Sequence, residues 1–268
     1  MTVTKNSFYT SLLAAAVALA SLTSGPGSAR ADFDAVLTTG EIDIEGFITG
    51  TNPQGQPQLG IRVRDVENGV TYTNPNRVLF SIDESVTRPL TGPGASATFD
   101  FLGVAPGEEI FVFPTDVGTG LFGGPDVAEP GLRNSARPTF ATLNFQFDPQ
   151  GFSGPGRFSF FTDGGTLLMS SDLSAFGGTT VPNQVNITSH VHFNWAFTQP
   201  GDYVLPFRVS QTLDGNQINS EWVNFNFQVV PEPTSFVLMG LGASVFGLAL
   251  RRRRLRQAKG KGEESLTA

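Results

Sequence analysis

The sequence predicts an all-β protein: a β-sandwich of short antiparallel strands, preceded by an N-terminal signal helix and followed by one C-terminal transmembrane helix. Between residues 32 and 230, apolar and polar residues alternate over many short segments, which is the period of a strand with one buried face. No segment in that range has a sustained 3.6-residue apolar period. Glycine and proline recur between the segments, as the turns of a single sandwich domain require.

Three segments show the alternation most clearly. In 222–229, Phe225, Phe227 and Val229 share one face, and amide side chains occupy the other. The same pattern is present in 142–147 and 203–209. The other expected strands are 36–48, 58–66, 78–81, 97–101, 109–113, 157–162, 166–169 and 187–197. The stretches rich in glycine and proline are expected to be loops, at 50–57, 88–94, 118–131 and 176–182.

The N-terminal 31 residues have the layout of a secretion signal. Lys5 precedes a short apolar run at 12–20, and a polar stretch then leads to Ala29-Arg30-Ala31, a small-x-small cleavage site. The run falls well short of the roughly 20 residues that cross a membrane, which disfavours a permanent N-terminal anchor. We therefore predict cleavage after Ala31, with 32–230 as the exported domain.

A second apolar segment, at 234–250, is free of charge and precedes a cluster of four arginines. The cluster is Arg251, Arg252, Arg253 and Arg254. As a helix the segment would be about 25 Å long, just enough for the hydrocarbon core. Guanidinium groups are costly to carry through lipid, so the cluster and the tail at 257–268 are expected to be cytoplasmic and the β domain external. A buried soluble helix is the alternative, which the adjoining positive charge disfavours.

Pro231, Glu232 and Pro233 stand directly before that apolar segment. The two prolines keep the backbone extended and outside the helix, which presents a lone carboxylate at the membrane surface. Together with the apolar span and the arginines, over 231–256, the triplet resembles the PEP-CTERM sorting signal of bacteria that make an extracellular polymeric matrix. The resemblance implies that the triplet is the processing site for an exosortase, a membrane-embedded cysteine transpeptidase. The implied partners are the exosortase, the secretion machinery and the membrane. The implied location is the periplasmic side of the inner membrane, then the cell surface or matrix after processing.

Charge and cysteine content exclude several classes of function. Residues 32–230 hold 21 acidic side chains against eight arginines and no lysine, a formal charge of −13. Such a surface repels nucleic acid and anionic lipid, and it suits divalent cations or simple solubility. The absence of cysteine excludes thiol nucleophiles, cysteine zinc sites and iron–sulfur clusters. The exported domain must therefore be stabilised by its own core rather than by disulfides.

The chain has two histidines, His190 and His192, inside the expected strand 187–197. A period of two places both imidazoles on one face with Asn194, where they can converge on one transition metal ion. Two ligands alone do not make a metal site. A pair of half-exposed structural histidines is the alternative interpretation of this spacing.

The residues around the histidines carry a second resemblance. From His190 to Tyr203 the chain reads His-Val-His-Phe-Asn-Trp-Ala-Phe and then enters a Pro-Gly turn. This run, with 36–43, 111–114 and 154–159 in the same order, resembles the choice-of-anchor M domain family. That family is surface-attached, β-rich and without an established enzymatic activity, and in actinobacteria it accompanies metal-type ABC transport systems. The resemblance implies that the two histidines are metal ligands.

The opening strand departs from that family at one position. Where the family has Gly-His-x-Asp, this chain has Gly-Glu-Ile-Asp at 40–43. Glutamate can bind a metal through oxygen, which gives His190, His192 and Glu41 as a candidate set for zinc or another divalent transition metal. The replacement is equally compatible with loss of the site.

No catalytic set is evident in the sequence. It has no Gly-x-Ser-x-Gly elbow for a serine hydrolase, and we find no general base or cleft signal that would direct a bound metal to hydrolysis. The segments 163–165 and 214–216 are expected to be hairpin turns, because they lack the spaced oxygen ligands of a calcium loop.

The leading functional hypothesis is therefore a non-enzymatic structural or binding module of the cell surface or extracellular matrix. Metal binding at the surface is the first alternative. The second is binding of extracellular polysaccharide by loop residues such as Leu121 and Phe122, for which the sequence offers no specific signal.

Overall fold

A computed structural model describes most of the β domain, over residues 33–83, 86–87, 97–116, 122, 127–172 and 182–230. The expected signal peptide with Ala29 and Ala31 lies outside these residues, as do the Pro231–Pro233 triplet, the apolar span and the arginine cluster. Among the described residues, no helix has the length and apolar character needed to cross a membrane. The described part consists mostly of β-strands with two short 3₁₀ helices, η1 (Pro75–Arg77) and η3 (Ala97–Leu102).

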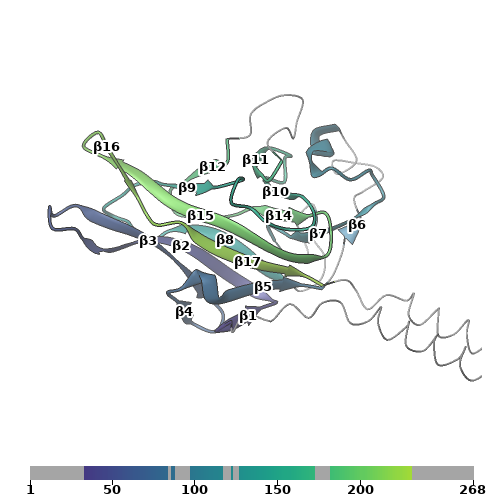
Figure 1. Cartoon of the computed structure of the whole chain (residues 1–268), viewed down its shortest axis with the longest axis horizontal. Coiled ribbons are helices and arrows are strands. Elements are labelled where there is room, and N and C mark those ends of the chain that lie inside the picture. The colour runs from purple at the N-terminus through teal and green to yellow at the C-terminus, as the bar shows by residue number, and fades with distance from the viewer. Residues whose placement is uncertain are drawn as a thin grey trace, which may run out of the picture.

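The described strands form three sheets, which Figure 1 shows from the front. The first sheet has the order β1-β5-β17-β15-β9-β12 with β16 beside β15; its strands are β1 (Ala35–Leu37), β5 (Val78–Ile82), β9 (Leu143–Phe147), β12 (Gln184–Ile187), β15 (Gly201–Leu213), β16 (Asn216–Asn219) and β17 (Val223–Val229). The second sheet has the order β13-β8-β2-β3-β4; its strands are β2 (Gly40–Thr51), β3 (Pro57–Asp65), β4 (Val70–Tyr72), β8 (Ala128–Asn134) and β13 (His190–His192). The third sheet has the order β11-β10-β14-β7-β6; its strands are β6 (Val86–Thr87), β7 (Glu109–Phe113), β10 (Phe158–Phe161), β11 (Leu167–Ser170) and β14 (Asn194–Phe197).

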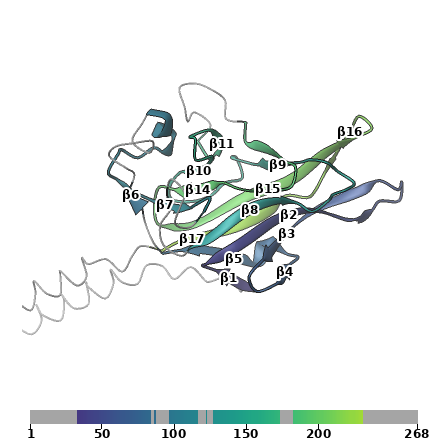
Figure 2. The ribbon, with the colours of Figure 1, turned by 180° about the vertical axis from the view of Figure 1, so that it is seen from behind.

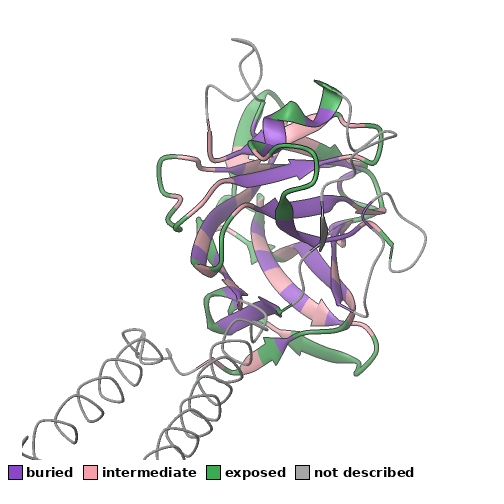
Figure 3. Cartoon of the chain, turned by 90° about the vertical axis from the view of Figure 1, so that its right-hand side faces the viewer, coloured by how far each residue is buried: buried purple, intermediate pink, exposed green. Residues whose placement is uncertain are grey.

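The first two sheets face each other and the third lies to one side of them. β15 contacts β3, and β5 and β12 contact β8; Figure 2 shows the same arrangement from behind. Figure 3 shows buried residues along the strands and exposed residues mainly in the turns and loops that connect them. Since each sheet has an apolar inner face, the domain is stabilised by a shared core, as expected for an exported chain without cysteine.

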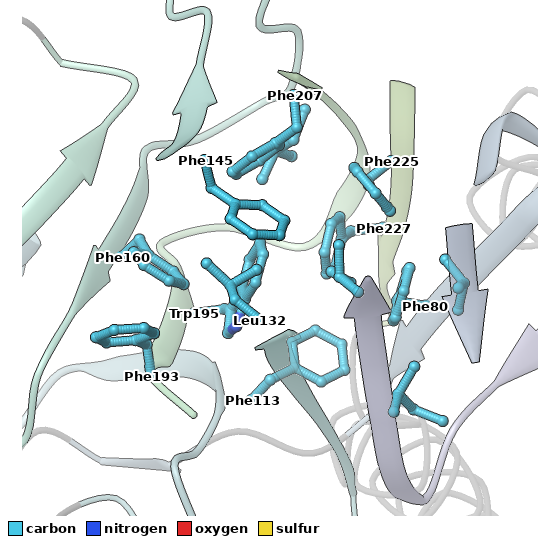
Figure 4. Packing of buried hydrophobic residues seen from close by; sticks show 14 of the residues in the cluster. Phe80, Phe113, Leu132, Phe145, Phe160, Phe193, Trp195, Phe207, Phe225 and Phe227 are labelled. Carbon is cyan, nitrogen blue, oxygen red and sulfur yellow. The ribbon is translucent and has the colours of Figure 1, made fainter. Parts of the chain in front are cut away.

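Aromatic side chains dominate that core. The alternation predicted in β17 is confirmed, because Phe225, Phe227 and Val229 are buried. Trp195 of β14 is fully buried at the centre, and Figure 4 shows it among phenylalanines. Its ring lies 4.7 Å from that of Phe160 and 5.6 Å from that of Phe227, spacings typical of favourable aromatic pairs.

Not all of the strands are short or antiparallel, so that part of the prediction is wrong. β15 has 13 residues and β2 has 12. Among the described strands, three pairs are parallel: β1 with β5, β5 with β17, and β2 with β8. Each parallel pair joins strands far apart in the sequence, because parallel strands require a long crossover. Apolar alternation does not reveal strand direction.

The expected strand at 97–101 is instead the 3₁₀ helix η3. Phe99, Phe101 and Leu102 all point into a second, smaller core cluster, so the alternation of Phe99 and Phe101 imitates a strand. Gly103, at a φ of +74°, ends the helix by donating its amide to the carbonyl of Asp100. A residue without Cβ adopts this conformation at little cost.

The expected strand at 187–197 is divided among all three sheets. It supplies the end of β12, all of β13 and all of β14. Asn194 therefore does not share a face with the histidines: it is buried, and its side-chain amide donates to Asp163 Oδ1 at 2.7 Å. The change of sheet turns Phe193 and Trp195 into the core while His190 and His192 stay on the second sheet.

The expected loop at 118–131 includes the first residues of β8. Proline and glycine at 130–131 favour a turn in the sequence, yet they lie in an inner strand. The backbone amide of Asn134 donates to the carbonyl oxygen of Ser189 in front of β13. Because backbone amides alternate sides along a strand, an amide at position 130 would also face β13. β13 ends opposite Gly131, so the missing N–H of Pro130 removes no hydrogen bond from the sheet. The expected hairpin turns at 163–165 and 214–216 are present between their strands.

Candidate functional site

The candidate site lies on the second sheet, on the face turned away from the core. In β2, Ile42 and Ile44 are buried in the core cluster, so the alternate residues Glu41, Asp43 and Glu45 project to the opposite face. In the neighbouring ladder, Gly131 of β8 pairs with Asp43 on one side and with His192 on the other. Strand period thus places three carboxylates and two imidazoles on one surface.

Gly131 allows groups from β13 and β2 to meet above β8. Strands two apart in a sheet are separated by roughly 9.5 Å, so side chains from the outer two must lean over the middle one. A Cβ at Gly131 would lie 2.7 Å from His190 Nε2 and 2.9 Å from His192 Cε1. Both imidazoles therefore occupy the space that a side chain at this position would fill.

Glu41, His190 and His192, the three residues predicted from the sequence, come together here. One ligand atom from each lies within 4.8 Å of the others. Glu41 Oε1 is 3.7 Å from His190 Nε2 and 3.9 Å from His192 Nε2, and the two imidazole centroids are 4.6 Å apart. Ligand atoms about 2.0–2.1 Å from a tetrahedral zinc ion are about 3.4 Å from one another. Small side-chain movements would therefore bring all three onto one ion.

Asp43 belongs to the same cluster, although sequence reasoning did not select it. Its Oδ1 is 2.8 Å from His190 Nε2, an ion-pair distance, although neither atom makes a hydrogen bond within the described part of the chain. Asp43 is fully buried. The signal was present in the sequence, because a period of two places Asp43 on the face of Glu41.

Arginines balance the buried carboxylates beside the cluster. Arg133 Nη1 donates to Asp43 Oδ2 at 2.7 Å, and Arg62 Nε donates to Glu45 Oε2 at 2.6 Å. Asp43 and Glu45 are only 0% and 2% exposed, and buried carboxylates without such partners would be strongly destabilising. The guanidinium groups therefore give both acids a partner and hold their orientation.

The electrostatics favour a neutral imidazole at His192. Burial lowers the pKa of this side chain below its ordinary value of 6.5, and the neighbouring His190 lowers it further. Glu129, Glu41 and Asp43 raise the same pKa by smaller amounts. A neutral ring leaves one nitrogen lone pair free at neutral pH, which is the form that binds metals.

The tail of the chain carries the sorting signal expected from its sequence. Residues 229–254 match the PEP-CTERM protein-sorting motif. The match includes the triplet Pro231–Pro233, the apolar span and the arginine cluster. No curated protein and no solved structure matches the chain. The motif indicates an exported, exosortase-targeted surface protein, with exosortase as its processing partner.

One residue offered for polysaccharide binding is not available at the surface. Phe122 is 4% exposed and packs against Phe99 and Phe161 in the second core cluster. A ring must present an open face to stack on a sugar, so Phe122 cannot do this. Leu121 lies outside the described residues.

Proposed function

We propose that this chain is a non-enzymatic surface protein whose β domain binds a divalent transition metal ion of the zinc type. The convergence of Glu41, His190 and His192 above Gly131 is the observation that supports the proposal most directly. Imidazole nitrogen and carboxylate oxygen are the ligand types that zinc prefers when thiolates are absent. The acidic charge of the domain favours attraction of a dication.

Metal binding accounts for the site better than two purely structural histidines do. His190 Nε2 is buried and has no hydrogen-bond partner in the part of the chain that the structure describes, and the same is true of His192 Nδ1. An unsatisfied buried polar atom costs about 1–3 kcal/mol, and structural histidines are normally satisfied. An ion at the cluster would bind His190 Nε2, which now has only the ion-pair contacts with Asp43 and Glu41. Glu41, at 39% exposed, leaves the cluster open to solvent, so an ion can enter.

The proposal places the domain, a β-sandwich of the choice-of-anchor M type over 32–230, on the periplasmic side of the inner membrane. Cleavage of 1–31 starts its export, and a helix at 234–250 retains it until the exosortase acts at the Pro-Glu-Pro triplet. The protein then moves to the cell surface or extracellular matrix. The match to the sorting motif supports this route, because that tail is the substrate of the processing enzyme.

Zinc titration of the purified full-length chain in detergent tests the metal proposal. We expect the wild type to bind zinc and a His190→Ala/His192→Ala variant to bind more than about 100-fold more weakly, since changes behind the ligands alone cost 10–100-fold. A Gln184→Ala/Asn186→Ala variant, altered on the edge strand β12, serves as the matched control and should bind like wild type. Equal affinity in wild type and histidine variant, or no binding by wild type, contradicts the proposal.

Deletion of 231–268 tests the sorting route. We expect the truncated chain to be exported but neither retained in the membrane nor processed, because triplet, span and arginines are all removed. A chain lacking only 257–268 keeps the matched motif and should be sorted normally. Cell fractionation and intact-mass measurement give location and cleavage. Unchanged location and processing after the long deletion would show that the motif is not used.

A further inference from the structure

We infer that Asp43 is the fourth ligand of this metal site and closes its coordination sphere. The inference rests on the proposed function and adds to it the ligand set and the type of site. With Asp43, the ion is held by two imidazoles from β13 and two carboxylates from β2. No position is then left for a substrate.

The first support is the position of an unpartnered oxygen. Asp43 is fully buried, yet among the described residues its Oδ1 has no hydrogen-bond partner, and the same holds for His190 Nε2 at 2.8 Å from it. The two atoms make no hydrogen bond with each other, although a simple pair would place the imidazole N–H along the line to the oxygen. Ligand atoms of a tetrahedral zinc ion are about 3.4 Å apart. A side-chain movement of roughly 0.6 Å would therefore let both atoms bind one ion.

The second support is the way Arg133 holds the other oxygen. Arg133 Nη1 donates to Asp43 Oδ2 at 2.7 Å, which fixes the carboxylate and leaves Oδ1 directed at His190. Outer partners that orient a ligand in this manner accompany most protein metal sites. By contrast, Glu45 on the same face has Arg62 on its Oε2 and no imidazole contact among the described ion pairs. Of the two buried acids, Asp43 is therefore the one placed to bind.

The third support is the repeated geometry of the four side chains. Glu41 and Asp43 are two apart on β2, and His190 and His192 are two apart on β13, so each pair presents neighbouring groups on one face. Gly131 lies between the pairs in the ladder. An ion above it would bind both flanking strands and cross-link β13, a three-residue edge strand, to the long strand β2.

The type of site follows from the ligand count. Closed four-ligand zinc sites are structural, whereas catalytic sites keep one position open for water or substrate. Two carboxylates also attract the dication. Calcium prefers six to eight oxygen ligands, so this set selects a transition metal over the calcium that is abundant outside cells. The site would thus capture or hold an ion rather than activate water.

Cobalt(II) in place of zinc reports the coordination directly, because four-coordinate cobalt absorbs visible light far more strongly than six-coordinate cobalt. We expect the cobalt-loaded full-length chain to show the intense spectrum and to be unaffected by added azide, which needs an open position. An azide-induced change in the wild-type spectrum overturns the inference without any variant being made.

An Asp43→Asn variant provides the second arm. We expect its zinc affinity to fall at least about tenfold and its cobalt complex to take up water and respond to azide. Glu45→Gln is the matched control, a buried acid on the same face, and should keep the wild-type spectrum. Wild-type zinc affinity and spectrum in a folded Asp43→Asn variant would mean that Asp43 only pairs with His190, and the inference fails while the proposed function stands. If the wild type binds neither metal, both are wrong. If Asp43→Asn does not fold, judged by circular dichroism, the azide result with wild type decides.

Discussion

Replacing Gly131 with alanine is expected to abolish zinc binding although every proposed ligand remains in place. The added Cβ would lie 2.7 Å from His190 Nε2 and 2.9 Å from His192 Cε1, closer than non-bonded atoms approach. The imidazoles must move away, and a displacement of about 1 Å breaks a coordination bond that tolerates about 0.2 Å. We expect zinc affinity to fall more than about 100-fold, measured by titration of the full-length chain.

The backbone itself should accept this alanine, because Gly131 is not among the glycines with positive φ. Gly50→Ala is the matched control: it lies in β2 of the same sheet, and a Cβ there meets no atom of the described residues within 4 Å. Both variants should keep the wild-type circular dichroism spectrum, and only Gly131→Ala should lose zinc. Equal affinity in the two variants would show that the ion, if bound, does not lie above β8.

Part of the site could be predicted from the sequence because it depends on local period. The His-x-His spacing placed two imidazoles on one face. Glu41 came instead from the resemblance at 40–43, where it stands at the position of the family's histidine. What spacing cannot give is the order of strands in a sheet. The contact between β2 and β13 depends on β8 lying between them, and β8 was hidden because Pro130 and Gly131 favour a turn. Gly131 was therefore missed, whereas the period of two alone could have found Asp43 on the face of Glu41.

The fold shows the same division between local and long-range information. Apolar alternation identified strands that form the core, including β9, β15 and β17. It did not show that β2 and β8 run parallel, since their pairing joins residues more than 80 positions apart. It also failed where one apolar run serves two sheets, as at Phe193, between the end of β13 and the start of β14.

Trp195 links the core to the site. Its indole Nε1 donates to the carbonyl oxygen of Pro130 at 2.9 Å. That carbonyl lies beyond the end of β13, so the indole supplies the hydrogen bond that a longer β13 would have made. Pro130 directly precedes Gly131. The hydrogen bond from the indole therefore helps to hold Gly131 in its position beneath the two imidazoles.

Replacement of this indole should consequently affect both stability and zinc binding. Trp195→Ala is expected to lower the free energy of unfolding by about 3–5 kcal/mol, the range for buried aromatic truncations. Trp195→Phe keeps most of the apolar contacts but leaves the Pro130 carbonyl unpaired, for a loss of about 1–3 kcal/mol, with weaker zinc binding as well. Urea denaturation followed by circular dichroism measures the first effect and zinc titration the second.

The other tryptophan provides the control for both measurements. Trp222 is 42% exposed, with Arg208 stacked on its ring at 4.5 Å, so Trp222→Ala should change the free energy of unfolding by less than about 1 kcal/mol. Its zinc affinity should equal that of wild type. A Trp195→Phe variant that loses stability yet binds zinc normally would separate the core from the site. In that case the position of Gly131 would be set by the β2–β8 and β8–β13 ladders alone.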